Sequence, residues 1–116
     1  MSKYTIYHNP RCSKSRQTLA LLREKDIEPQ VIEYLKTAPN AHDLKAISKK
    51  LGLSAADMAR TNEAVFSELG LADPSTSETQ IFDAIAANPI LLERPIVVLG
   101  DKAVIGRPPE NVLALS

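Results

Sequence analysis

Residues 95–105 have the sequence Pro-Ile-Val-Val-Leu-Gly-Asp-Lys-Ala-Val-Ile, in which two β-branched runs flank the pair Gly100-Asp101. A two-residue linker that starts with glycine is a strong signal for a β-hairpin, because glycine accepts the backbone torsions of a type I′ or II′ turn. The sequence therefore predicts antiparallel strands over Pro95–Leu99 and Lys102–Ile105. Pro95 opens the first strand, where its missing N–H is least costly.

The N-terminal part of the chain has a different pattern. Lys3 to Tyr7 is a β-branched and aromatic run, residues 13–25 have helical composition, and Gln30 to Tyr34 forms a second strand candidate. Strand, helix and strand in this order form a βαβ unit, which implies a right-handed crossover and a parallel strand pair.

The segment between these halves contains helix signals. Asn40 with Asp43, and Ser77 with Gln80, are spaced as capping residues, the second pair opening a helix that ends at Ala87. Residues 54–60 and 63–69 are expected to form shorter helices. A last short helix is expected near Pro109-Glu110, burying Val112, Leu113 and Leu115. The order βαβ, helices, ββα predicts a single α/β domain over residues 1–116. We expect a thioredoxin-like fold with a mixed four-stranded sheet and a helical insertion at about residues 40–88.

Composition excludes several functional classes. Fourteen basic residues balance fourteen acidic residues, so no overall field favours nucleic acid or an anionic membrane. No apolar run approaches the roughly 18 residues of a membrane span. The N-terminus has no signal-peptide pattern, which predicts a cytoplasmic protein. We expect neither a nucleic acid nor a membrane as partner.

Cys12 is the only cysteine and directly follows the first predicted strand, where a helix begins. Unpaired N–H groups at a helix N-terminus favour a thiolate, and Arg11, Lys14 and Arg16 add positive charge nearby. The sequence therefore predicts a lowered pKa and a reactive thiol. The alternative, an inert buried thiol, fits poorly with so polar a segment.

Two neighbours of Cys12 bear on its chemistry. Ser15 stands where a dithiol oxidoreductase has its second cysteine, so a mixed disulfide formed on Cys12 needs an outside thiol to resolve it. His8 is either a partner of the thiolate or a structural histidine bonded to the loop.

Three of the six arginines stand at predicted junctions: Arg60 between short helices, Arg94 before Pro95, and Arg107 before Pro108. Guanidinium groups bind tetrahedral oxyanions through paired hydrogen bonds. Arginines that converge on a thiolate would indicate an oxyanion or carboxylate substrate.

Five segments together resemble the glutaredoxin-coupled arsenate reductase family. They are His8-Asn9-Pro10-x-Cys12-x-x-Ser15-Arg16-x-Thr18-Leu19, residues 33–37, Arg60, residues 89–98, and Gly106-Arg107-Pro108-Pro109-Glu110. The similarity covers about residues 4–113. Ser13-Lys14 departs from the Gly-Thr usual after the cysteine, which indicates a divergent, housekeeping-type branch.

The resemblance implies that Cys12 is the nucleophile, that His8 helps to activate it, and that Arg60, Arg94 and Arg107 hold arsenate. Ser15 and Lys14 are expected to assist in substrate binding. It implies no metal and no bound cofactor; glutathione is the co-substrate, and glutaredoxin reduces the mixed disulfide as arsenite leaves.

Two other functions stay open at this point. A glutaredoxin-like reductase of glutathione mixed disulfides would need Cys12 but not three arginines. A non-enzymatic RNA-polymerase-binding regulator that senses thiol stress would usually carry a C-x-x-C pair, which Ser15 interrupts.

Overall fold

The computed structural model describes residues 4–115; Lys3, where the first predicted strand begins, lies outside them. The chain divides into two compact units. The first comprises Met1–Thr37 and Arg94–Ser116, and the second comprises Ala38–Glu93. The second unit is thus the segment between the two predicted halves of the sheet.

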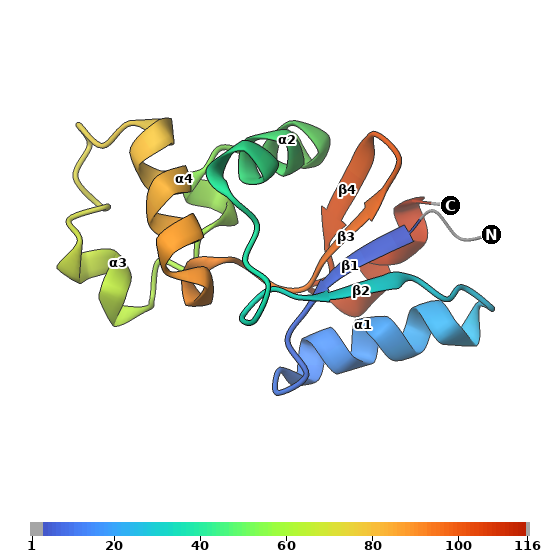
Figure 1. The fold of residues 1–116 in the computed structure, drawn as a ribbon. Helices are drawn as coiled ribbons and strands as arrows, with labels where there is room; N and C mark the ends of the chain where they lie inside the picture. Colours follow the sequence, from blue (N-terminus) through green and yellow to red (C-terminus); the bar gives the residue numbers. More distant parts are fainter. Residues whose placement is uncertain (1–3, 116) are drawn as a thin grey trace. The chain divides into compact units, whose positions relative to one another are not determined.

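The first unit contains a four-stranded sheet in the order β2-β1-β3-β4 (Figure 1). The strands are β1 (Tyr4–His8), β2 (Gln30–Glu33), β3 (Ile96–Leu99) and β4 (Lys102–Ile105). β1 pairs with β2 in parallel, whereas β1 with β3 and β3 with β4 are antiparallel. Helix α1 (Ser13–Glu24) connects β1 to β2, and the 3-10 helix η3 (Pro109–Leu115) follows β4. The predicted thioredoxin-like arrangement, with its βαβ unit and its hairpin, is confirmed.

The core of this unit forms between the sheet, α1 and η3. Its buried members are Ile6, Leu19, Leu22, Val97, Val112 and Leu115. The prediction that Leu113 is buried is wrong, because this residue is 44% exposed. The physical reason is the helix type, because a 3-10 helix repeats every three residues and so buries Pro109, Val112 and Leu115.

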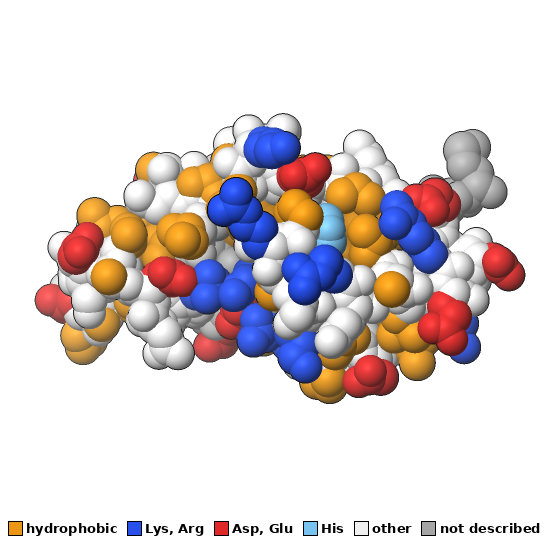
Figure 2. All heavy atoms as spheres, turned by 90° about the horizontal axis from the view of Figure 1, so that it is seen from below, with side chains coloured by type: hydrophobic (Ala, Val, Ile, Leu, Met, Phe, Trp, Pro, Cys, Tyr) orange, Lys and Arg blue, Asp and Glu red, His pale blue; other side chains and the backbone are white. Residues whose placement is uncertain are grey.

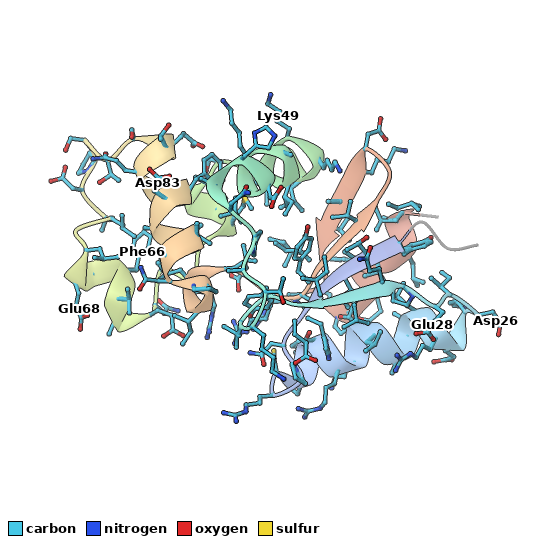
Figure 3. The ribbon with its side chains drawn as sticks, in the orientation of Figure 1. Asp26, Glu28, Lys49, Phe66, Glu68 and Asp83 are labelled. Atoms are coloured by element: carbon cyan, nitrogen blue, oxygen red, sulfur yellow. The ribbon has the colours of Figure 1, made fainter. Side chains whose placement is uncertain are left out.

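Two turns fix the connections in the first unit. Gly100 has φ 63°, while Asp101 is not among the described residues with positive φ, which fits a type II′ turn. At the end of α1, Asp26 has φ 61°. Beyond it, Glu28 accepts hydrogen bonds from Arg23, and both Asp26 and Glu28 lie in the α1–β2 connection (Figure 3).

The second unit is helical. Its elements are α2 (Ala41–Leu51), η1 (Ala56–Met58), α3 (Ala64–Glu68), α4 (Glu78–Ala87) and η2 (Pro89–Leu91). Both predicted capping pairs are confirmed at the starts of α2 and α4. The helix predicted over residues 54–60 is reduced to the single turn η1. It ends early because Ala59 adopts extended backbone and forms an isolated antiparallel bridge with Leu92.

Acidic and basic side chains are both present on the face of the molecule that Figure 2 shows, in keeping with the net charge of zero. None of the helices within residues 4–115 has the length and apolar character needed to cross a membrane.

Candidate functional site

Cys12 lies between β1 and α1, at the N-cap position of the helix. Its backbone is extended, with φ −92° and ψ 123°, and in the described part of the chain no side chain caps α1 through a hydrogen bond. The Cys12 N–H donates to the Asn9 carbonyl at 3.0 Å, and the Cys12 carbonyl accepts the Arg16 N–H at 3.0 Å. The sulfur therefore stands where most helices have a capping oxygen, and the residue is partly exposed.

The surroundings of Cys12 lower its pKa. Burial of the thiol acts in the opposite direction, but the backbone N–H of Ser15, the Arg94 guanidinium, the backbone N–H of Lys14 and the Arg107 guanidinium together outweigh it. N–H groups of a first helical turn and nearby cations both favour the thiolate over the neutral thiol. The predicted lowering of the Cys12 pKa is thus supported by named groups, two of them guanidiniums.

Arg94 and Arg107 are brought together by the end of the β3–β4 ladder. Ile96 and Ile105 are the last paired residues, and beyond them the Gly106 N–H donates to the Pro95 carbonyl at 2.9 Å. Arg94 directly precedes Pro95 and Arg107 directly follows Gly106, so the two arginines flank this one hydrogen bond. Both Arg94-Pro95 and Arg107-Pro108 peptide bonds are cis. Arg94 is half-buried and Arg107 is exposed.

His8, the last residue of β1, and Ser15, in the first turn of α1, form a buried pair. His8 Nδ1 lies 2.6 Å from Ser15 Oγ, and the same Oγ accepts the Asn9 N–H at 3.0 Å. Burial lowers the pKa of His8; Glu33 on β2 opposes this effect, and Arg23 and Arg16 reinforce it. The neutral ring is therefore favoured, so His8 offers hydrogen bonding to Ser15 rather than positive charge.

The charged side chains that neighbour Cys12 in sequence are not among the groups that lower its pKa. Arg11, Lys14 and Arg16 are all exposed. Arg16 Nη1 donates to the Pro10 carbonyl at 2.9 Å. The backbone N–H of Lys14 lowers the Cys12 pKa, whereas the guanidinium groups that lower it belong to Arg94 and Arg107. Groups distant in sequence thus do what the local charges were expected to do.

Arg60 lies in the second unit, just after η1. Its Nη1 is 2.8 Å from Glu63 Oε1, and both side chains are about a quarter exposed. Its backbone N–H donates to the Leu91 carbonyl. The Arg60 side chain is therefore held by a carboxylate of its own unit.

Two residues without a predicted role, Thr18 and Asn111, also shape the loop that carries Arg107. Thr18 is fully buried, and its hydroxyl lies 2.8 Å from the Lys14 carbonyl and 3.3 Å from the Gly106 carbonyl. Asn111 Nδ2 donates to the Ile105 and Arg107 carbonyls at 3.1 and 3.3 Å. The sequence signal for Thr18 was its position three residues after Ser15, on the same helix face as Leu19 and Leu22.

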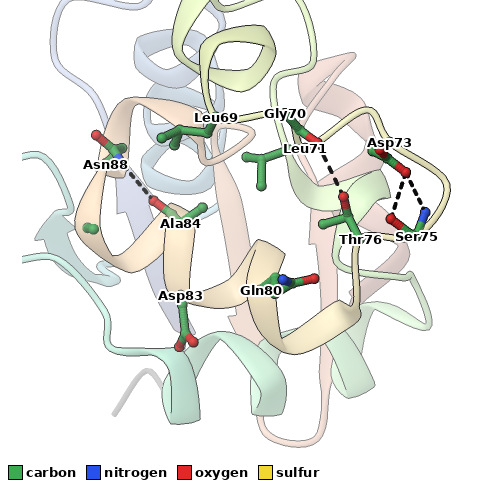
Figure 4. Close-up of a pocket in the computed structure, with 11 residues that line it drawn as sticks. Leu69, Gly70, Leu71, Asp73, Ser75, Thr76, Gln80, Asp83, Ala84 and Asn88 are labelled. Atoms are coloured by element: carbon green, nitrogen blue, oxygen red, sulfur yellow. Dashed lines mark hydrogen bonds between the residues drawn. The ribbon is translucent and has the colours of Figure 1, made fainter.

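The second unit also contains a cavity of about 520 Å³ between the 69–76 segment and α4 (Figure 4). Its lining is partly acidic, with Asp73 and Asp83, and none of the predicted site residues contributes to it. Among residues 4–115, no three His, Cys, Asp or Glu side chains are grouped so that they could hold a metal ion.

Comparison with known proteins agrees with this geometry. The chain is 48% identical to an arsenate reductase of Neisseria meningitidis over 116 residues, covering 99% of both chains. It is 53% identical over 111 residues to the uncharacterized protein YfgD of Escherichia coli K12, covering 95% of this chain and 93% of that one. The structure of an arsenate reductase from Vibrio cholerae, 49% identical, superposes with a TM-score of 0.96 over 97% of each chain. The model of the ArsC family matches residues 7–115. This chain belongs to the ArsC family.

Proposed function

We propose that this protein reduces arsenate to arsenite, with the Cys12 thiolate as nucleophile and with glutathione and glutaredoxin as the source of electrons. The observation that carries the proposal is the cysteine at the start of α1, whose pKa is lowered by two backbone N–H groups and by Arg94 and Arg107. The similarity to arsenate reductases of Neisseria and Vibrio supports arsenate as the substrate.

Arsenate binding would use the guanidinium groups. Arg94 and Arg107 present donors beside the thiolate, and a guanidinium fork matches two oxygens of a tetrahedral oxyanion. The same positive charge that favours the thiolate would offset repulsion between it and the anionic substrate. We assign Arg60 to this anion site as well, which requires that its guanidinium share donors between Glu63 and the substrate, since it carries five N–H groups. Lys14, which is exposed, would add positive charge.

The reaction would begin with attack of the Cys12 sulfur on arsenic, forming an S–As bond as one arsenate oxygen leaves as water. Arsenic must then accept two electrons. Two thiols that become one disulfide supply them, but the chain has a single cysteine and Ser15 in the C-x-x-S position. We therefore propose glutathione as the second thiol: arsenite leaves, a Cys12–glutathione disulfide remains, and glutaredoxin reduces it.

His8 and Ser15 would act on the geometry of the loop. The hydroxyl of Ser15 ties His8 at the end of β1 to the Asn9 N–H, while the Ser15 backbone N–H stabilises the sulfur. Such a pair would keep the thiolate oriented during attack without itself carrying charge. Thiol-dependent turnover needs a reducing compartment, and we therefore propose the cytoplasm as its location.

The test is a coupled assay with arsenate, glutathione, glutaredoxin, glutathione reductase and NADPH. We expect arsenate-dependent oxidation of NADPH that stops when glutathione is omitted and that falls to background in Cys12→Ser. Turnover of a small glutathione mixed disulfide without turnover of arsenate would overturn the proposal in favour of a glutaredoxin-like reductase. Absence of both activities, with specific retention of RNA polymerase, would favour a regulator.

A further inference from the structure

We propose that Thr18 is a positioning residue that holds the backbone carrying Arg94 and Arg107 against the first two turns of α1. The inference builds on the proposed function, since it concerns how the arginines meet the thiol. It is made from contacts within the first unit alone.

The hydroxyl of Thr18 is the first part of this contact. Its oxygen lies 2.8 Å from the Lys14 carbonyl, one turn earlier in α1, and 3.3 Å from the Gly106 carbonyl. A hydroxyl has one proton, so the two carbonyls share it. Threonine often bonds to the carbonyl four residues earlier, and that bond alone would be unremarkable. The second acceptor, 88 positions away in sequence, is what joins α1 to the loop after β4.

The absence of a side chain at residue 106 is the second part. A Cβ at Gly106 would lie 2.7 Å from Thr18 Oγ1, 3.0 Å from Thr18 Cγ2 and 2.9 Å from Pro95 Cγ. These distances are shorter than van der Waals contact allows, and both Thr18 and Pro95 are buried and closely packed. Any larger residue would move the loop away from α1. Thr18 and Gly106 are therefore joined at one point both by a hydrogen bond and by close packing.

The arginines are fixed at this same point. Gly106 donates its N–H to the Pro95 carbonyl at 2.9 Å, and Arg94 and Arg107 are the residues directly outside that hydrogen bond. Cys12 begins the helix that carries Thr18. A shift of the 95/106 pair relative to α1 would thus move both guanidinium groups relative to the sulfur. Misplacement of binding groups by about 1 Å can cost on the order of a hundredfold in rate.

The test compares Thr18→Val, which keeps the shape but removes the hydroxyl, with Thr18→Ser, which keeps the hydroxyl. We expect Thr18→Val to raise KM for arsenate about tenfold. We also expect it to shift the pH midpoint of Cys12 alkylation by iodoacetamide upward, because the guanidiniums that favour the thiolate have moved. Thr18→Ser should stay close to the parent protein in both measurements.

Ser48→Ala is the matched control. Ser48 is a buried serine of α2, in the second unit, whose hydroxyl donates to the Leu53 carbonyl at 2.5 Å. Its loss should lower the melting temperature but leave KM and the alkylation midpoint unchanged. If Thr18→Val behaves in the same way, with only a lower melting temperature, Thr18 is merely structural and the inference is overturned.

Gly106→Ala provides a second route should Thr18→Val fail to fold. It keeps every hydrogen-bonding group and should also raise the alkylation midpoint; an unchanged midpoint would contradict the inference. The alkylation assay needs no arsenate. A parent protein that fails to reduce arsenate would therefore remove the proposed function, while the alkylation midpoints would still decide the role of Thr18.

Discussion

The three longer helices begin in two different ways. Helix α2 begins with a capping box in which Asn40 Oδ1 accepts the Asp43 N–H at 2.8 Å and Asp43 Oδ2 accepts the Asn40 N–H at 3.3 Å. Helix α4 repeats this with Ser77 and Gln80 at 3.1 and 2.7 Å. Helix α1 has no such oxygen within the described residues; Cys12 occupies its N-cap position.

The difference separates a capped helix start from one that acts on a thiol. In α2 and α4, a side chain at the N-cap already accepts the N–H of the third helical residue, so this N–H has little to offer a ligand. In α1, the N–H groups of Lys14 and Ser15 act on a sulfur whose charge depends on pH. Arg94 and Arg107 then add cations beside the same sulfur. A helix start without a capping oxygen favours an anionic sulfur here because a second part of the fold supplies positive charge.

The largest effect should follow from changing one of those cations. Arg94→Lys keeps the positive charge but loses the planar fork, so an oxyanion can no longer be held through paired hydrogen bonds. We expect kcat/KM for arsenate to fall more than about tenfold, as two charge-assisted hydrogen bonds become one. The measurement is the coupled NADPH assay.

Arg23→Lys is the matched control for that substitution. Arg23 is exposed near the end of α1 and pairs with Glu28 at 3.1 Å, so its replacement should leave turnover unchanged. Activity of Arg94→Lys within about twofold of the parent would mean that charge alone suffices, and that the α1 site does not bind the oxyanion through the Arg94 fork.

The starts of these three helices could largely be predicted from the sequence. The capping pairs at Asn40 and Ser77 were predicted because such motifs are local and their hydrogen bonds close within four residues. The position of Cys12 at a helix start followed for the same reason. The hairpin was predictable because Gly100-Asp101 allows few other conformations.

What the sequence alone did not reveal depends on contacts between distant residues. Arg11 and Arg16 adjoin Cys12 in sequence, yet the cations that lower its pKa are Arg94 and Arg107, which the β3–β4 ladder brings to the thiol and which only the family resemblance had placed at this site. The fit between Thr18 and Gly106 joins residues 88 positions apart. The exposure of Leu113 depends on η3 being a 3-10 helix, which a short apolar pattern does not distinguish from an α-helix.

Removing the caps should have a smaller effect of a different kind. Asn40→Ala and Ser77→Ala each remove an acceptor for a first-turn N–H, and we expect each to lower the free energy of unfolding by about 1 kcal/mol. Urea denaturation measures this change. Neither substitution should alter the alkylation rate of Cys12, because neither group acts on the thiol. A changed rate would show that the capped helix starts and the start of α1 are coupled, and the distinction between them would not hold.

The smallest effect concerns the pH dependence of stability that Cys12 itself produces. The pKa of the Cys12 thiol is lower in the folded state than its unfolded value of about 8.5, so the folded state loses this proton at a lower pH. Between the two pKa values, the unfolded state therefore binds more protons than the folded state. The stabilising contribution is therefore complete above the unfolded pKa and is lost as pH falls through the folded pKa. Cys12→Ala lacks this titration, while His8 titrates in both proteins and cancels from their difference. We expect the parent's free energy of unfolding, relative to Cys12→Ala, to rise as pH is raised from about 6 to about 9 in urea denaturation.

A difference that stays flat would mean that the sulfur gains nothing from its position at the start of α1. One that falls with rising pH would mean that the fold disfavours the thiolate, and α1 would then begin no differently from a helix that simply lacks a cap.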